Sequence, residues 1–170
     1  MTEQEIAEIC ESYNIKKWKL NLQTNLVDVD NNVDLYKKNL TELPLPFGNV
    51  SGYFSCYKNN LTSLEHSPKN VGGDFECVYN KLTSLEHAPI YVGGNFSCSY
   101  NKLTSLEHCP ENVGGDFYCG YNNLVSLEHS PKYIGGDFDC VYNKIIQRQN
   151  INWLNVGGNI YFDKNFKWIF

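Results

Sequence analysis

One phrase of 21 residues recurs along most of this 170-residue chain. The copy that runs from Val71 to Tyr91 begins Val-Gly-Gly-Asp-Phe and continues through Tyr-Asn-Lys-Leu-Thr-Ser-Leu-Glu-His. Nearly identical copies start at Val92, Val113 and Ile134, and a slightly different copy starts at Val50. Spacing this regular is typical of a β-rich solenoid, in which each repeat winds once around a shared apolar core. Residues one repeat apart should therefore be neighbours in space.

Each repeat contains a short segment that alternates like a strand with one buried face. In the copy from Val71, Phe75 and Cys77 are predicted to face inward, while Asp74 and Glu76 face outward. Because every copy has this segment at the same place, the strands should pair in register. We expect one parallel sheet along one face of the stack, built from 21-residue coils.

The residues around this strand indicate how the chain turns. Gly72 and Gly73 precede it and predict a tight entry, through either positive φ or close backbone approach. After the strand, Leu82 and Leu85 should point inward, and Pro89 ends any helix before it can extend. The face opposite the sheet should therefore have little helix, and the stack should curve only slightly.

An asparagine follows the strand in every copy of the repeat. Its carbonyl oxygen can accept and its amide can donate hydrogen bonds, so it can bond the backbone of adjacent coils and turn the chain. We predict a structural ladder formed by Asn59, Asn80, Asn101, Asn122, Asn143 and Asn165.

Five of the seven cysteines also share one slot of the repeat: Cys56, Cys77, Cys98, Cys119 and Cys140. We interpret them as a column of small buried hydrophobes. A metal-thiolate stack is the alternative, although the paired Cys-x-x-Cys spacing of zinc sites is missing. Reduced thiols and an acidic start without the pattern of a signal peptide favour a cytoplasmic protein.

The chain is expected to form one solenoid domain over residues 1–170, with a cap at each end. The expected parts are an N-terminal cap (1–28), a degenerate repeat (29–49), five repeats (50–155), and a partial repeat with a C-terminal cap (156–170). In the first cap, Thr2 and Glu5 form a plausible capping box. An amphipathic helix should follow over Glu3–Ser12, with its apolar side at Ile6, Ile9, Cys10 and Tyr13.

Two strands are expected after this helix, around residues 17–22 and 26–29. At the other end, Phe166, Trp168, Ile169 and Phe170 either plug the last coil or form an end for self-association, which allows a homodimer.

Charge and motifs exclude several functions. The net charge of −5 argues against a nucleic-acid binder, and no apolar run is long enough to span a membrane. One ridge carries Glu65, Glu86, Glu107 and Glu128 beside His66, His87, His108 and His129. A repetitive ridge lacks the pocket and nucleophile of an enzyme, so we interpret it as structural, with a pH response or a histidine metal site as alternatives. We expect no enzymatic activity, no metal and no cofactor.

The outward positions of the strand predict three columns on one face. The first contains Tyr53, Asp74, Asn95, Asp116, Asp137 and Asn159; the second contains Ser55, Glu76, Ser97, Tyr118, Asp139 and Tyr161; the third contains Tyr57, Val78, Ser99, Gly120 and Val141. Beside them runs a tyrosine column, Tyr79, Tyr100, Tyr121 and Tyr142, preceded by Lys58.

These columns have the features of a binding face. Tyrosine dominates protein-binding hot spots, and a group of carboxylates can steer a basic partner. We predict contacts with a partner at Tyr53, Asp74, Glu76, Tyr79, Asn95, Tyr100, Asp116, Tyr118, Tyr121, Asp137, Asp139, Tyr142 and Tyr161. The alternatives are that the tyrosine rings only stack on one another and that the acidic positions form a solvated strip.

The phrase Leu-Thr-Ser-Leu-x-x-x-Pro-x-x-Val, followed by Phe-x-Cys-x-x-Asn, resembles the leucine-rich repeat in its short bacterial form. It is similar to the repeats of LPX-type bacterial effectors, with Glu86 and His87 in place of Pro-x. It resembles still more the uncharacterised leucine-rich-repeat proteins of bacteriophages, which share Val-Gly-Gly-Asp-Phe-x-Cys. The resemblance covers about Val29 to Asn165 and implies protein recognition. The ligase domain of the effectors is not expected here, so no catalytic role carries over.

The sequence therefore favours a non-catalytic protein-binding module. It would be phage-encoded and would bind, and inhibit, a host protein such as a defence enzyme in the host cytoplasm. The alternatives are an acidic nucleic-acid mimic that inhibits a nuclease, and a structural protein that assembles with itself.

Overall fold

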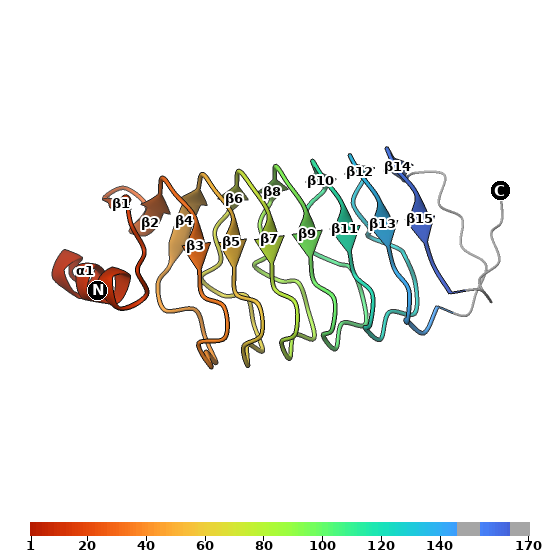
Figure 1. Ribbon diagram of the computed structural model, residues 1–170, viewed down its shortest axis with the longest axis horizontal. Coiled ribbons are helices and arrows are strands. Elements are labelled where there is room, and N and C mark those ends of the chain that lie inside the picture. The colour runs from red at the N-terminus through yellow and green to blue at the C-terminus, as the bar shows by residue number, and fades with distance from the viewer. Residues whose placement is uncertain (146–153, 164–170) are drawn as a thin grey trace.

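The computed structural model describes residues 1–145 and 154–163. It is a β-solenoid of about 6 turns with coils of ~21 residues, as the repeat predicts. The coils form a nearly straight row, with the N-terminal helix at one end (Figure 1). No helix in this part of the chain is long and apolar enough to cross a bilayer. Asn165 and the four C-terminal apolar residues, predicted to join the ladder and the cap, lie outside the described residues.

Two sheets run along the stack where one was expected. The expected sheet, here called the outer sheet, contains β3 (Val33–Asp34), β5 (Phe54–Ser55), β7 (Phe75–Glu76), β9 (Phe96–Ser97), β11 (Phe117–Tyr118), β13 (Phe138–Asp139) and β15 (Ile160–Tyr161). Its strands are parallel and pair in register, so that Phe75 lies opposite Phe96 and Glu76 opposite Ser97.

The other sheet, here called the entry sheet, precedes the glycine pair of each coil. It contains β1 (Trp18–Asn21), β2 (Leu26–Val29), β4 (Phe47–Val50), β6 (Asn70–Val71), β8 (Tyr91–Val92), β10 (Asn112–Val113), β12 (Tyr133–Ile134) and β14 (Asn155–Val156). Most of its strands have two residues, and the residues beside them do not extend an alternating pattern as they do in the outer sheet.

A continuous apolar core fills the space between these sheets and the return segments. In one coil, Phe75, Cys77, Leu82 and Leu85 are fully buried. The phenylalanine rings stack from coil to coil, with a distance of 5.3 Å between the centroids of Phe75 and Phe96. The cysteine column is buried as predicted, and its thiols are free.

The glycine pair forms a corner between the two sheets, where neighbouring coils pass very close to each other. A Cβ added to Gly72 would lie 2.2 Å from the carbonyl oxygen of Ser51 in the preceding coil. Close backbone approach is therefore the reason for glycine here. The alternative of positive φ is wrong, because no glycine among the described residues has a positive φ.

The asparagine ladder is confirmed for the members that the structure describes. The side chain of Asn80 accepts a hydrogen bond from the N–H of Leu61 at 3.0 Å. Its amide donates to the carbonyls of Cys56 at 3.0 Å and Cys77 at 3.1 Å. One side chain thus satisfies buried backbone groups of two coils, and Asn59, Asn101, Asn122 and Asn143 repeat the arrangement.

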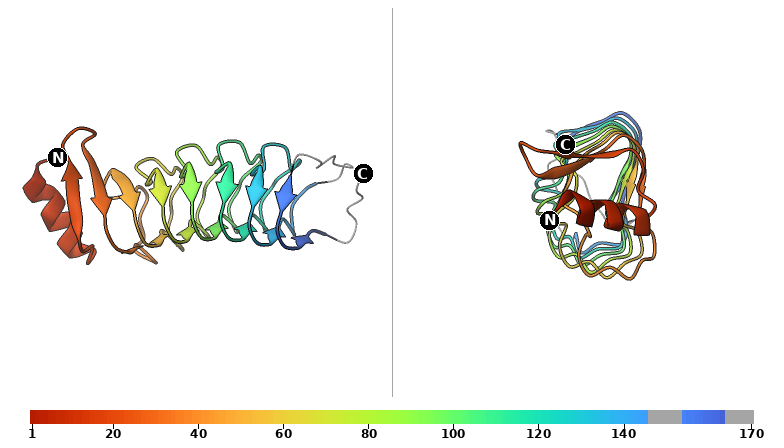
Figure 2. Two further views of the ribbon diagram at one scale, coloured as in Figure 1. Left: turned by 90° about the horizontal axis from the view of Figure 1, so that it is seen from above. Right: turned by 90° about the vertical axis from the view of Figure 1, so that its left-hand side faces the viewer.

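The N-terminal cap also matches the expectation. Helix α1 (Glu3–Ser12) begins with a capping box, in which Thr2 accepts from the N–H of Glu5 and the Glu5 carboxylate accepts from the N–H of Thr2. Ile6 and Cys10 are buried against the core. Strand β1 then pairs antiparallel with β2, and the helix lies across the end of the stack (Figure 2).

Candidate binding face

The register of the outer sheet brings the residues of the predicted second column together. Ser55 pairs with Glu76, and Tyr118 pairs with both Ser97 and Asp139. At the last strand, Asp139 pairs with Tyr161. These outward side chains form one continuous face, and the largest of them, Tyr118 and Tyr161, occur toward the C-terminal coils.

The first column takes part in holding the coils together. The Oδ1 atom of Asp74 accepts a hydrogen bond from the N–H of Asn95 at 2.7 Å, and Asn95 accepts from Asp116 in the same way. Asp116 and Asp137 continue the series toward Asn159. One oxygen of each side chain is therefore part of the scaffold, a role that the sequence analysis did not anticipate. Asp and Asn both occur in this column, and both supply the same Oδ1 acceptor.

Tyr118 and Asp116, two of the predicted contact residues, are hydrogen-bonded to each other through their side chains. The hydroxyl of Tyr118 donates to Oδ2 of Asp116 at 2.6 Å. This bond lowers the pKa of Asp116 and raises the pKa of Tyr118 to about 12. The aspartate is thus kept ionised and the tyrosine protonated, and the ring is held against the face.

The tyrosine column is a ladder of stacked rings. The ring centroids of Tyr79 and Tyr100 are 4.1 Å apart, those of Tyr100 and Tyr121 also 4.1 Å, and those of Tyr121 and Tyr142 4.3 Å. Stacking, which the sequence analysis kept as an alternative to recognition, therefore occurs. It leaves the outer edges of the rings accessible, and Tyr142 is 60% exposed.

The ladder continues through two tyrosines that the sequence analysis did not place in it. Tyr57 contacts Tyr79 with a centroid distance of 5.7 Å, and Tyr36 stacks on Tyr57 at 5.2 Å. Both occur one residue earlier in the repeat than Tyr79. The ammonium group of Lys58 lies 6.0 Å from the ring centre of Tyr57 and 5.9 Å from that of Tyr79. It therefore lies close to both rings at the point where the ladder passes from one repeat position to the next. We call the resulting row of six rings the tyrosine ladder; its members are Tyr36, Tyr57, Tyr79, Tyr100, Tyr121 and Tyr142.

The backbone at four of these tyrosines is left-handed. Tyr79, Tyr100, Tyr121 and Tyr142 have φ between 53° and 56°. A left-handed backbone favours glycine or asparagine and disfavours a bulky side chain by about 1–2 kcal/mol. The backbone conformation of the turn therefore does not explain why tyrosine occurs at these positions. We attribute its occurrence to the interactions of the aromatic ring.

A shallow hollow joins the N-terminal part of the ladder to the outer sheet. It has a volume of about 260 Å³, and Tyr36, Tyr57, Tyr53 and Ser55 contribute to its lining. Because residues of the ladder and of the first two columns share this hollow, the ladder and the outer sheet form one surface.

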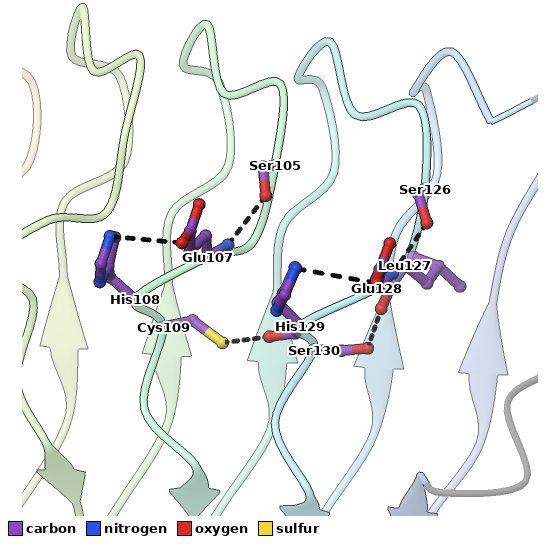
Figure 3. A network of polar contacts seen from close by, with 9 residues as sticks. All are labelled: Ser105, Glu107, His108, Cys109, Ser126, Leu127, Glu128, His129 and Ser130. Carbon is purple, nitrogen blue, oxygen red and sulfur yellow. Dashed lines mark hydrogen bonds and ion pairs between the residues drawn. The ribbon is translucent and has the colours of Figure 1, made fainter.

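The Glu-His ridge lies on another side of each coil, where its residues are exposed (Figure 3). Nε2 of His108 lies 3.9 Å from Oε1 of Glu107, whose own N–H donates to Oγ of Ser105 at 3.0 Å. The imidazole therefore lies close enough to the carboxylate to form an ion pair with it when the histidine is protonated. These histidines also have a left-handed backbone, with φ of 67° at His108 and 64° at His129.

Burial keeps the described thiols whose pKa is raised in their protonated, less nucleophilic form. Burial raises the pKa of Cys77 and Cys98 well above the usual value, and it raises the pKa of Cys109 to about 12. The thiol of Cys109 donates to the carbonyl of His129 at 3.1 Å (Figure 3). In residues 1–145 and 154–163, no group of three or more His, Cys, Asp or Glu side chains is arranged to hold a metal ion.

Comparison with known proteins identifies no relative. No protein-family model matches the chain, and neither a curated protein nor a solved structure matches it. The function must therefore be inferred from the geometry of the outer sheet and the tyrosine ladder.

Proposed function

We propose that this protein is a non-catalytic module that binds another protein through the outer sheet and the tyrosine ladder. The observation that carries the proposal is the choice of tyrosine at left-handed positions, where the backbone favours glycine or asparagine. Tyrosine combines a large apolar area with a polar tip and loses little rotamer entropy on binding. Rings already stacked on their neighbours are ordered in advance, which lowers the entropic cost of association.

The surface beside the ladder also suits protein recognition. The outer sheet presents Glu76, Tyr118 and Asp139 from parallel strands that are rigidly connected to the core. A solenoid offers such columns on a long, stiff support, which is the form that repeat proteins use for recognition. The resemblance to phage leucine-rich-repeat proteins favours a host protein in the cytoplasm as the partner and inhibition of that protein as the outcome.

The experiment exploits the left-handed backbone. In the variant Tyr79→Gly/Tyr100→Gly/Tyr121→Gly, glycine tolerates the φ angle without strain, so the turns are retained while the rings are removed. The matched control, His87→Gly/His108→Gly/His129→Gly, makes the same kind of change at left-handed positions on the ridge. Circular dichroism and thermal melts would establish that both variants keep the fold.

Immobilised wild type should retain one stoichiometric protein from host lysate, and the histidine variant should retain it equally. The tyrosine variant should bind the isolated partner about 30-fold more weakly or worse, since a buried tyrosine hot spot contributes 2 kcal/mol or more. Equal binding by the tyrosine variant, or no stoichiometric partner for the wild type, would contradict the proposal.

A further inference from the structure

The hollow in the outer sheet has a small residue at its centre and carboxylates on both sides. Ser55 pairs with Asp34 in the preceding coil and with Glu76 in the following coil, so the second column reads Asp34, Ser55, Glu76 at this place. A serine between two longer side chains leaves a depression. The depression has a volume of about 260 Å³, which is enough for one side chain and small for a drug-sized ligand.

Aromatic rings contribute to the lining of the same hollow. Tyr36 and Tyr57 belong to the tyrosine ladder, and Tyr53 belongs to the first column together with Asp74. A cation near the face of a tyrosine is attracted by the quadrupole of the ring. The chain itself contains this interaction nearby, since the ammonium of Lys58 lies 6.0 Å from the centre of the Tyr57 ring.

Carboxylates line the hollow and, among the described residues, no cationic side chain does. Asp34, Asp74 and Glu76 take part in no ion pair with any residue that the structure describes. Asp34 and Asp74 each use Oδ1 as an acceptor for a backbone N–H, which fixes the two side chains in place. The hollow thus combines fixed negative charge with aromatic walls.

Ser55 provides a further and independent indication. Only 5% of this residue is exposed, and it lines the hollow. Its hydroxyl is not among the fully buried polar atoms without a partner, so within the described residues it remains accessible to water or to a ligand in the hollow. A ligand that enters the hollow and carries N–H donors would donate a hydrogen bond to this hydroxyl.

From these observations we infer that the hollow is a site for a basic side chain of the protein partner, and that arginine fits it best. A guanidinium group is planar, stacks on aromatic rings and pairs with carboxylates through several N–H donors at once. In the bound state it would lie among the tyrosine rings that line the hollow, with its N–H groups directed at Glu76 and at the hydroxyl of Ser55. This inference refines the proposed function, because it states what the partner places on the outer sheet.

The test uses N-acetyl-arginine-methylamide as the probe and the neutral analogue N-acetyl-citrulline-methylamide as its control. Tyrosine-ring and glutamate resonances of the intact protein would be followed by NMR during titration. The arginine probe should shift Tyr57 and Glu76 saturably, with a Kd of about 1–10 mM for a single partly exposed group. The citrulline probe should bind at least about 10-fold more weakly, because it lacks the positive charge and two of the five N–H donors of the guanidinium group.

Two variants with equal change in charge locate the site. Asp74→Asn/Glu76→Gln keeps an acceptor at Oδ1 for the N–H of Asn95, as asparagine does elsewhere in this column, and should weaken arginine binding about 10-fold. Asp137→Asn/Asp139→Asn makes the same change in charge outside the hollow and should leave the affinity for the arginine probe unaltered. Equal binding of both probes, equal loss in both variants, or no saturable shift would overturn the inference.

The outcome is separable from that of the proposed function. The variant with glycine at Tyr79, Tyr100 and Tyr121 retains Tyr36, Tyr53 and Tyr57, so it should still bind the arginine probe. If this variant loses the protein partner while Asp74→Asn/Glu76→Gln binds the partner normally, the proposed function is supported and the arginine site is rejected.

Discussion

Two adjacent residues in each coil, Tyr79 and Asn80 in one example, show how side-chain roles divide at the scale of the single residue. Asn80 is buried and bonds the backbone of two coils, whereas Tyr79 takes the strained left-handed turn and points its ring outward. The role of the asparagine could be predicted, because among side chains of its size only the carboxamide combines two N–H donors with a carbonyl acceptor. The full tyrosine ladder could not, since Tyr57 reaches Tyr79 from a neighbouring slot, and only the fold shows that their rings meet.

The asparagine ladder gives a prediction at this scale. In Asn101→Ala, the N–H of Leu82 and the carbonyls of Cys77 and Cys98 lose their partner inside the core. Buried backbone groups without a partner cost about 1–3 kcal/mol each, so urea denaturation should show a loss of about 3 kcal/mol or more in the free energy of unfolding. Asn112→Ala, at an exposed strand position, is the control and should change it little. Similar losses in both variants would show that the buried bonds have no special role.

At the scale of the element, segments with a clear sequence pattern were predictable and segments without one were not. Helix α1 has both a capping box and a helical apolar period, and it was predicted with its observed bounds. The outer sheet was predicted from Phe75 and Cys77, whose inward positions alternate with polar residues. The entry sheet was missed because Asn70 and Val71 of β6 belong to no alternating pattern. The glycines that follow them could be recognised as a corner only from the structure, which shows how closely neighbouring coils approach there.

The capping box of α1 supports a prediction about this element alone. Thr2→Ala removes the acceptor for the N–H of Glu5 and should destabilise the first turn by about 1 kcal/mol. Hydrogen exchange of the α1 amides should then accelerate about fivefold, while amides of the central coils keep their rates, because the helix can open locally. Glu11→Ala, at an exposed position of the same helix, should leave the exchange rates of α1 nearly unchanged. Unchanged exchange in Thr2→Ala would mean that the capping box does not stabilise the helix.

At the scale of the whole molecule, each coil depends mainly on its two neighbours. The pairings of the outer sheet join consecutive coils, for example β7 with β9 and β9 with β11. Stability should therefore be close to a sum of similar contributions from single coils and from the contacts between them. The repeat period was sufficient to predict this architecture, whereas the sequence has no equivalent signal for the partner that we propose for the outer sheet.

Deletion of one whole coil tests this additivity. Removal of residues 75–95 joins Asp74 to Phe96, which restores the sequence pattern of a coil, and the shortened protein should unfold cooperatively in urea. Its m-value should fall by roughly one eighth, since 21 of 170 residues are removed. Removal of residues 75–96 is the matched control, because it places Ser97 in the buried slot of Phe75 and reverses the inward and outward faces of the strand. A folded, equally stable control would contradict the predicted dependence on register.

The near-identity of successive coils also has a consequence for how such a gene can change. Tandem copies of the same DNA invite unequal recombination, and an exchange between equivalent points of two copies adds or removes a complete unit without shifting the reading frame. Because adjacent coils fit one another through the same glycine corner, the product of that exchange meets a ready-made packing surface. The length of the outer face can thus be increased or decreased by a whole coil in a single mutational event.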